Sequence, residues 1–245
     1  MQRAKSRTYR TWTEEVLERP IVLVGLMGAG KSSVGRLLAA RLGLEFVDAD
    51  SEIESAAGAT IEEIFETHGE AFFRSGERRV IDRLLTGPVR VIATGGGAFI
   101  DADTRRKIKA SGLSIWLKAD AETLLKRVSR RGGRPLLKDG DPRQVMSDLT
   151  AGRDPLYAEA DITVETSENP PAEVTERVIA AVAAHFGIEP PPRPRRAKSN
   201  GTGAANRGGG NSRGVKAKAD QKGGQRRRRR AARPAADTAS KAKDR

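Results

Sequence analysis

A phosphate-binding pattern stands near the start of the chain. Residues Gly25 to Ser32 fit Gly-x-x-x-x-Gly-Lys-Ser, between the apolar run Ile21–Val24 and a helical pattern that ends at Gly43. Glycines let backbone N–H groups turn towards an anion, Lys31 can reach the outer phosphates of a nucleotide, and the Ser32 hydroxyl can coordinate Mg²⁺. The pattern therefore predicts a nucleoside triphosphate site with one Mg²⁺ ion. An ordinary glycine-rich turn is the alternative, and the flanking strand and helix argue against it.

Two aspartates follow the next apolar run. Asp48 and Asp50 come directly after Leu44–Val47. P-loop enzymes commonly hold Mg²⁺ with an aspartate at the end of a later strand, but the candidate strand Val89–Ala93 ends without an acid. We therefore assign the metal to Asp48, and expect alternation along the strand to turn Asp50 towards a second substrate. The alternative is that the two aspartates only cap a helix beginning near Ser51.

Glycines and arginines complete the candidate chemistry. The run Gly95–Gly97 ends a predicted strand, where missing side chains would let a ligand approach backbone amides; a plain flexible turn is the alternative. Arginine carries a planar fork that binds two carboxylate or phosphate oxygens at once, although any single arginine here could be an ordinary surface residue. The candidates are Arg74, Arg134 and Arg153. Together with Asp50 they predict a pocket for a small polyhydroxylated carboxylate beside the γ-phosphate of ATP.

Hydrophobic periodicity predicts the elements that position these residues. The predicted strands are Ile21–Val24, Leu44–Val47, Val89–Ala93, Ser114–Leu117 and Asp161–Val164. The predicted helices are one that closes at Gly43, then Ser51–Ala57, Thr60–Leu85 with an interruption at His68–Gly69, Asp103–Ala110, Ala121–Arg131, Arg143–Thr150 and Pro171–Phe186. This alternation predicts an α/β fold with a parallel sheet, in which ligands bind at the carboxyl ends of the strands.

The charge of the chain is unevenly distributed. Its net charge is +13, but residues 190–245 carry 18 basic residues and 3 aspartates, which leaves a net charge of −2 for residues 1–189. The basic segment has a single large apolar residue, Val215, so we expect it to be disordered. It is either a solubilising extension or a weak, non-specific site for nucleic acid or an acidic partner. The predicted organisation is an extension at residues 1–19, one domain at residues 20–189 and a tail at residues 190–245.

Composition also bears on location. The chain has no cysteine, its first twenty residues lack the apolar core of a signal peptide, and no run reaches the length of a membrane span. We therefore expect a cytoplasmic protein with no membrane partner. We also expect a monomer.

Six ordered motifs resemble the successive signatures of shikimate kinases. They are Gly25 to Ser32, Asp48-Ala49-Asp50, Phe73-Arg74-x-x-Glu77, Gly95-Gly96-Gly97, Arg134-Pro135-Leu136-Leu137 and Arg153-x-Pro155-Leu156-Tyr157. The resemblance covers residues 20 to about 187. It implies a three-layer P-loop kinase fold of the nucleoside-monophosphate-kinase type, with a five-stranded parallel sheet in the order 2-3-1-4-5. It also implies ATP-dependent phosphorylation of the shikimate 3-hydroxyl, a step of chorismate and aromatic amino acid biosynthesis.

The resemblance further assigns roles to residues. Shikimate would be held by Asp50, Arg74, Gly95, Gly96, Gly97 and Arg153. The ATP phosphates would be held by Gly28, Ala29, Gly30, Lys31, Ser32 and Ser33, and the adenine side by Arg127, Asn169 and Pro170. Ser32 would bind Mg²⁺ directly and Asp48 through its water shell. Lys31, Asp50 and Arg134 would carry the catalysis, with Arg134 in a mobile lid at about residues 129–140.

Two other functions stay open from the sequence. A gluconate kinase would share the P-loop but should lack the pairing of Asp-x-Asp with Gly-Gly-Gly. A nucleic-acid-binding protein could instead use the kinase domain as a nucleotide-sensing switch, with the basic tail as its binding segment.

Overall fold

The computed structural model describes residues 17–130, 141–167 and 169–193. Its centre is a parallel sheet of five strands in the order β2-β3-β1-β4-β5, which confirms the predicted order. The strands are β1 (Ile21–Val24), β2 (Glu45–Asp48), β3 (Arg90–Ala93), β4 (Leu113–Lys118) and β5 (Ile162–Glu165). β1 lies in the middle of the sheet, where Val22 pairs with Ile92 of β3 and with Ser114 of β4.

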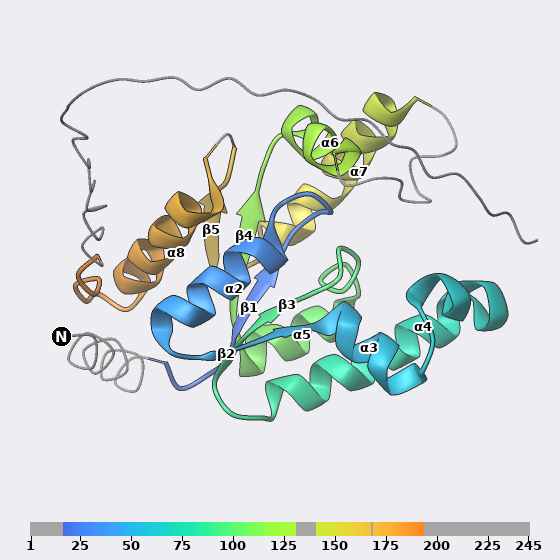
Figure 1. The fold of residues 1–245 in the computed structure, drawn as a ribbon, viewed down its shortest axis with the longest axis horizontal. Coiled ribbons are helices and arrows are strands. Elements are labelled where there is room, and N and C mark those ends of the chain that lie inside the picture. Colours follow the sequence, from blue (N-terminus) through green and yellow to red (C-terminus); the bar gives the residue numbers. More distant parts are fainter. Residues whose placement is uncertain (1–16, 131–140, 168, 194–245) are drawn as a thin grey trace, which may run out of the picture. The chain divides into compact units, whose positions relative to one another are not determined.

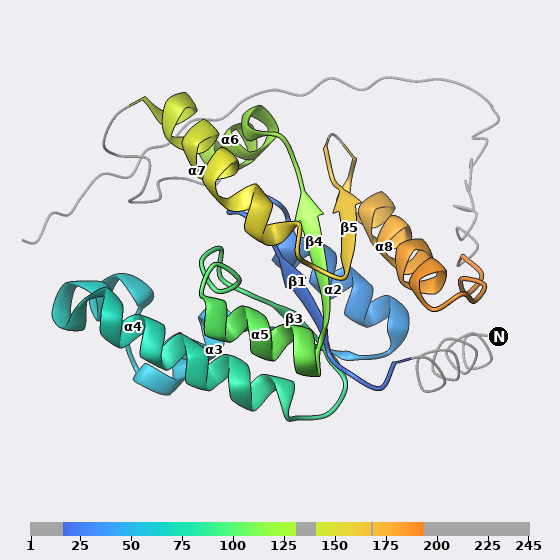
Figure 2. The same ribbon diagram turned by 180° about the vertical axis from the view of Figure 1, so that it is seen from behind.

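Helices cover both faces of the sheet. They are α2 (Lys31–Leu42), α3 (Ala49–Ala57), α4 (Ile61–Leu85), α5 (Ala102–Ser111), α6 (Ala121–Ser129), α7 (Pro142–Tyr157) and α8 (Pro171–His185). Figure 1 shows α2 and α8 in front of the sheet, and Figure 2, seen from behind, shows α4, α5 and α7 on the other face. The arrangement is the three-layer α/β fold that the sequence predicts.

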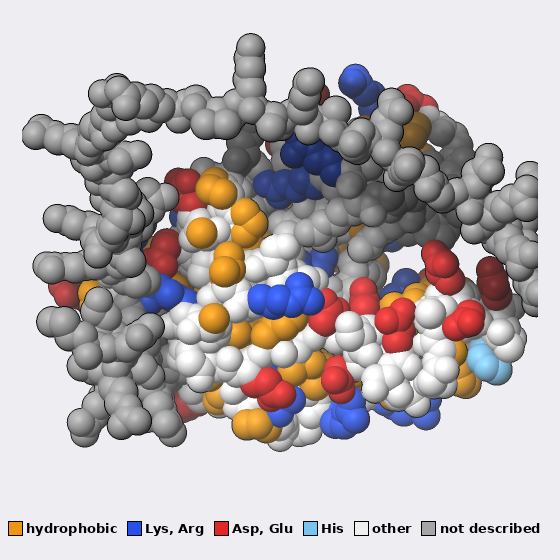
Figure 3. Space-filling view, viewed as in Figure 1, with side chains coloured by type: hydrophobic (Ala, Val, Ile, Leu, Met, Phe, Trp, Pro, Cys, Tyr) orange, Lys and Arg blue, Asp and Glu red, His pale blue; other side chains and the backbone are white. Residues whose placement is uncertain are grey.

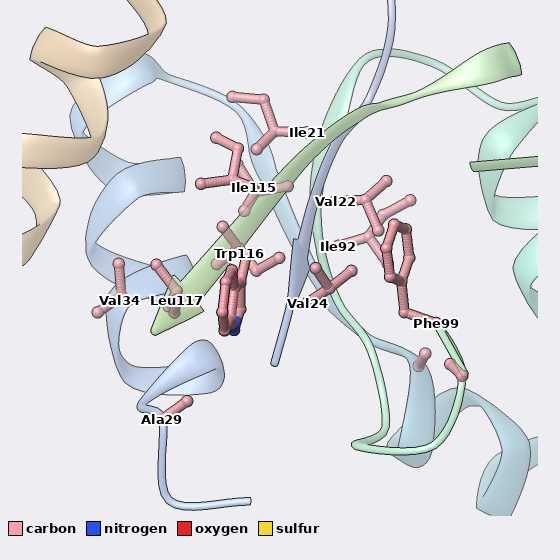
Figure 4. Close-up of a cluster of buried hydrophobic side chains, with 14 of the residues drawn as sticks. Ile21, Val22, Val24, Ala29, Val34, Ile92, Phe99, Ile115, Trp116 and Leu117 are labelled. Carbon is pink, nitrogen blue, oxygen red and sulfur yellow. The ribbon is translucent and has the colours of Figure 1, made fainter. Parts of the chain in front are cut away.

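The core lies on both sides of β1, all four residues of which are buried. Figure 4 shows Ile21 and Ile115 on the side of α2, and Val22, Ile92 and Phe99 on the opposite side. A parallel strand with two covered faces needs apolar side chains in both directions, which is why β1 is an unbroken apolar run rather than an alternating one. The sheet is therefore a rigid support for the loops at its carboxyl edge.

One helix is longer than the sequence predicts, and another contains the predicted interruption. α7 ends at Tyr157, seven residues beyond the expected end at Thr150. Gly152 and Pro155 resemble helix breakers, but Pro155 lies in the last turn and the fully buried Tyr157 holds that turn against the core. The interruption expected in α4 is present as a kink at Gly69, whose φ of 77° and ψ of 175° lie outside the helical region.

The described chain packs beyond the predicted domain boundary at residue 189. Arg41 of α2 forms a two-pronged ion pair with Glu176 of α8, at 2.8 and 3.2 Å, and also donates to the carbonyl oxygen of Pro192 at 3.3 Å. Pro191, next to it, is buried. Residues 190–192 are thus held on the surface formed by α2 and α8.

The surface over α3 and the first half of α4 is acidic (Figure 3). These helices contain Glu52, Glu54, Glu62, Glu63, Glu66 and Glu70. A polyanion would be repelled from this face, so the prediction of nucleic acid binding concerns the tail, whose residues 194–245 lie outside the described structure. Across the described ranges, none of the helices combines the length and the apolar character needed to cross a bilayer.

Candidate active site

The phosphate-binding loop joins β1 to α2 at the carboxyl edge of the sheet. Gly25 (φ 134°) and Gly28 (φ 82°) have backbone conformations that other residues rarely adopt, and a β-carbon on either would lie 2.8 Å from a backbone carbonyl oxygen. Gly30 is the N-cap of α2 and no side chain caps this helix, so the positive N-terminal end of α2 faces the loop. The residues expected to hold phosphates, Gly28 to Ser33, thus form a loop whose shape suits that task.

Lys31 folds back over this loop. Its Nζ donates hydrogen bonds to the carbonyl oxygens of Gly25 at 2.7 Å and of Leu26 at 3.0 Å. The ammonium charge therefore lies beside the amides of the loop, where it would attract the outer phosphates of a bound nucleotide.

Ser32 and Asp48 meet at the base of the loop. The Ser32 hydroxyl donates to Asp48 Oδ2 at 2.7 Å, while Asp48 Oδ1 accepts from the backbone amide of Asp50 at 3.2 Å and caps α3. The two interpretations of Asp48, as a helix cap and as a residue of the metal site, therefore involve different oxygens of one carboxylate. Both sequence-predicted metal residues are brought together.

Asp50 lies at the glycine loop, but the cause of its orientation differs from the one expected. The chain becomes helical at Ala49, so Asp50 lies in the first turn of α3 and the argument from strand alternation is wrong. Its side chain still lies against the glycine loop, because a β-carbon on Gly95 would be 2.7 Å from Asp50 Oδ1 and 3.1 Å from Glu77 Oε1. The helix turn replaces the strand pleat as the cause of its orientation.

Arg74 lies against the same glycine loop at Gly97, two residues after Gly95. A β-carbon on Gly97 would be 2.6 Å from its Nη1 and 2.7 Å from its Nη2. The same Nη1 donates to Glu77 Oε2 at 2.7 Å, one turn along α4. Arg74 and Asp50, expected to bind one substrate, are therefore brought to one short loop.

Gly96 connects this group to the phosphate-binding loop. Its carbonyl oxygen accepts from Arg153 Nη1 at 3.3 Å and from the Tyr157 hydroxyl. On its other side, a β-carbon would be 3.5 Å from the backbone nitrogen of Met27. The glycine loop is thus in contact with the phosphate-binding loop on one side and with α7 on the other.

Burial sets the electrostatics of this group. Glu77 is 2% exposed, and burial, together with the charges of Asp50 and Asp101, raises the pKa of its carboxyl above the usual range despite the Arg74 guanidinium. Glu77 lies against the glycine loop and Arg74, and the sequence prediction gave it no role. Its spacing of three residues from Arg74 on a helix was the signal that could have identified it.

A separate cavity of about 240 Å³ lies beside the phosphate-binding loop. Gly28, Arg127 and Asn169 line it, as does Pro171 at the start of α8; Pro170, predicted to contact adenine, is the residue that precedes this helix. The Arg127 guanidinium donates to the Thr166 carbonyl and hydroxyl oxygens, both at 3.1 Å, and to the carbonyl of Ser167. Arg127 and Asn169, both expected near adenine, thus line one cavity together with residues expected near phosphate.

Arg134 and most of its predicted lid, residues 131–140, lie outside the described residues. Tyr157, like Glu77, was part of a recognised motif without an assigned role. The signal for it was weak, because a buried tyrosine is ordinary in a core and its helix was expected to end seven residues earlier.

Comparison with known proteins identifies the family of the chain. The family model described as shikimate kinase matches residues 27–183. The shikimate kinase of Paramagnetospirillum magneticum is 57% identical over 171 residues, which cover 70% of this chain and 88% of that protein; the one of Rhodopseudomonas palustris is 55% identical over 174 residues, covering 71% and 86%. A solved shikimate kinase from Acinetobacter baumannii, in complex with shikimate, is 40% identical with a TM-score of 0.67 and covers 73% of this chain and 97% of its own. The chain belongs to the shikimate kinase family.

Proposed function

We propose that the chain transfers the γ-phosphoryl group of ATP to the 3-hydroxyl of shikimate at the junction of its phosphate-binding loop and its glycine loop. The reaction itself, ATP-dependent phosphorylation of shikimate in aromatic amino acid biosynthesis, is that of its family. The observation that supports the location is the position of Gly96, between Met27 of one loop and Arg153 and Tyr157 of α7. Phosphoryl transfer depends mainly on holding donor and acceptor in line, and contact between the two loops provides that.

The acceptor side is proposed to hold shikimate by its charge. Arg74 from α4 and Arg153 from α7 approach the glycine loop from two helices, and two planar guanidinium groups match the oxygens of one carboxylate. Glu77 orients Arg74 through their 2.7 Å ion pair. Asp50 is proposed to accept a hydrogen bond from the reacting hydroxyl and to take its proton as the new bond to phosphorus forms and the bond to ADP breaks. Because the transition state is loose, orientation of the hydroxyl should matter more than the basicity of Asp50.

The donor side is proposed to hold ATP through the loop from Gly28 to Ser33. Backbone amides and the N-terminus of α2 bind the phosphates, and Lys31 turns from the loop carbonyls to the outer phosphate oxygens. The neighbouring cavity lined by Arg127 and Asn169 is proposed to hold the adenosine part.

One Mg²⁺ ion is proposed to accompany ATP. The Ser32 hydroxyl and the Asp48 carboxylate, 2.7 Å apart, are oxygen donors of the kind that this ion prefers. Among the described residues no group of three His, Cys, Asp or Glu side chains is arranged to hold a metal, which fits an ion that takes its other ligands from phosphates and water. When bound, Mg²⁺ would neutralise phosphate charge.

Arg134 stays a proposal, since it lies outside the described residues. It belongs to the segment between the end of α6 at Ser129 and the start of α7 at Pro142. Arg130, just before that segment, lines the nucleotide cavity, so the segment starts close to the proposed ATP site. We propose that Arg134 approaches the phosphates there and stabilises the charge that develops during transfer.

A coupled assay of ADP release across acceptors tests this function. We expect ADP release with shikimate and only background rates with gluconate or with nucleoside monophosphates. Gluconate carries its carboxylate and hydroxyls in a different arrangement, and a nucleoside monophosphate carries a phosphate, which is larger than a carboxylate. Lys31→Met should abolish the signal. Equal rates with gluconate and shikimate would contradict the proposed acceptor site, and activity retained in Lys31→Met would contradict the donor site.

Cytoplasmic location and binding of polyanions by the tail are further proposals, supported by the composition alone, and a monomeric state is proposed beside them. Gel shifts with the full chain and with residues 1–189, at two salt concentrations, test the binding of polyanions. Binding by the full chain alone, weakened by salt, would support it. Equal shifts for both proteins would contradict it.

A further inference from the structure

Tyr157 occupies a buried position from which it reaches the acceptor loop. It is the last residue of α7, and its side chain is fully buried. Its hydroxyl donates to the carbonyl oxygen of Gly96, in the middle of the glycine loop. A buried tyrosine hydroxyl needs some partner, but a partner in the core or in its own helix would serve equally well for stability. The hydrogen bond to Gly96 therefore indicates a role for Tyr157 at the acceptor site.

Arg153 shares this acceptor with Tyr157. The two residues are four positions apart on α7 and therefore project from the same face of the helix. Arg153 Nη1 reaches the Gly96 oxygen at 3.3 Å, near the long end of the hydrogen-bond range. An arginine that turns to a substrate carboxylate would weaken or give up this long bond, whereas the tyrosine bond would persist.

The tyrosine ring is itself fixed on two sides. It stacks on Phe99, which follows the glycine loop, with ring centres 6.4 Å apart, and on Trp116 of β4, at 5.9 Å. Trp116 in turn lies under the phosphate-binding loop, since a β-carbon on Gly25 would be 3.3 Å from its ring. Figure 4 shows Trp116 beside Val24, the last residue of β1. The ring is thus fixed between Phe99, just after the glycine loop, and Trp116, which lies against the first glycine of the phosphate-binding loop.

The Tyr157 hydroxyl stays protonated over the pH range in which enzymes commonly work. Burial raises the pKa of Tyr157 to about 12. The group is therefore a neutral donor near neutral pH, suited to a carbonyl oxygen and unable to act as a base.

We propose that Tyr157 is a positioning residue for the acceptor, which keeps the Gly96 peptide in place when Arg153 leaves it to bind the shikimate carboxylate. The inference rests on the proposed assignment of Arg153 and the glycine loop to shikimate. Without the hydroxyl, the glycine loop would lose its second anchor at the moment of binding, and the acceptor would be held less well. The nucleotide side, bound by Gly28 to Ser33, would be unaffected.

Steady-state kinetics of Tyr157→Phe test this role. The substitution keeps the stacked ring and removes only the hydroxyl, so the protein should fold. We expect the KM for shikimate to rise about three- to tenfold, the effect of losing one hydrogen bond, while the KM for ATP changes less than about twofold. Calorimetric titration with shikimate alone should show the same loss of affinity.

Ser114→Ala is the matched control. The Ser114 hydroxyl is also fully buried and bonds Asp161 at 2.5 Å, but near the amino ends of β4 and β5, away from both loops. The Ser114→Ala substitution should lower the melting temperature and leave the KM values for shikimate and for ATP unchanged. If Tyr157→Phe behaves as this control does, the residue is only structural and the proposal is wrong. Equal rises in both KM values would also overturn it. An unmodified enzyme that fails to phosphorylate shikimate would overturn the proposed function, and this inference with it.

Discussion

Arg74 and Glu77 form an asymmetric ion pair, in which the arginine side chain is 28% exposed and the glutamate side chain 2% exposed, at 2.7 Å. The buried partner is fixed by its surroundings, and the exposed partner is the one that can meet a ligand. Such a pair does little for stability by itself, because desolvation of the carboxylate offsets much of the attraction. Its value lies in holding a guanidinium at the glycine loop.

The first prediction concerns Glu77→Gln. Without the carboxylate charge, Arg74 is held less firmly, and we expect the KM for shikimate to rise about tenfold with little change in the KM for ATP. Because the pKa of Glu77 is raised, the native enzyme should lose affinity for shikimate as the pH falls through that raised value, and Glu77→Gln should not show this loss. Profiles of kcat/KM for shikimate against pH measure both effects. Identical profiles for the two enzymes would contradict the role of Glu77.

Stability should follow the opposite trend with pH. The folded state holds the Glu77 proton more tightly than the unfolded state, so ionisation of this group lowers stability as the pH rises from the ordinary carboxyl pKa through the raised one. Removing the ionisable group in Glu77→Gln should flatten that part of the stability curve. Denaturant unfolding at several pH values would show it.

The second prediction concerns Gly97→Ala. A β-carbon there would lie 2.6 Å from Arg74 Nη1, so the guanidinium must move away from the loop. We expect kcat/KM for shikimate to fall about tenfold or more, since small displacements of a positioning group are costly. Gly76→Ala is the control, on the same helix as Arg74, with open space where the β-carbon would stand. It should keep activity and gain up to about 1 kcal/mol of stability. Unchanged kinetics in Gly97→Ala would contradict the placement of Arg74.

The sequence predicted the sheet and the phosphate-binding loop well, because apolar runs and a spaced glycine motif are local signals. It did not predict why the glycine run exists. The space that side chains at Gly95 and Gly97 would fill was expected to be open to a ligand. Asp50 lies in that space at Gly95 and Arg74 lies in it at Gly97, and both side chains come from helices that are distant in sequence. The end of α7 was missed for a similar reason: Tyr157 is held by tertiary packing that overrides the local effect of Pro155.

The third prediction separates the two roles of Asp48. In Asp48→Asn the side-chain oxygen can still cap α3, so stability should change by less than about 0.5 kcal/mol. The loss of charge should raise the Mg²⁺ concentration needed for half-maximal activity about tenfold. Thr60→Ala, which removes the cap of α4, should do the reverse: it should cost about 1 kcal/mol and leave the Mg²⁺ dependence unchanged. Titration of activity with Mg²⁺ and thermal unfolding measure the two effects. An unaltered Mg²⁺ requirement in Asp48→Asn would remove Asp48 from the metal site.

The fourth prediction concerns where the folded domain ends. Arg41 is held by Glu176 and by the carbonyl oxygen of Pro192, and Pro191 is buried beside them. A chain that ends at residue 189 loses this buried proline and one of the two acceptors of Arg41 Nη2, the carbonyl oxygen of Pro192. It should therefore be less stable than a chain that ends at residue 193, by about 1 to 2 kcal/mol. Both should retain the kcat of the full chain at a temperature well below unfolding, because Pro192 and Arg193 bind Arg41 and Glu176, which have no role in the proposed site. Parallel denaturant unfolding of the two chains measures the difference, and equal midpoints would show that residues 190–193 add nothing to the fold.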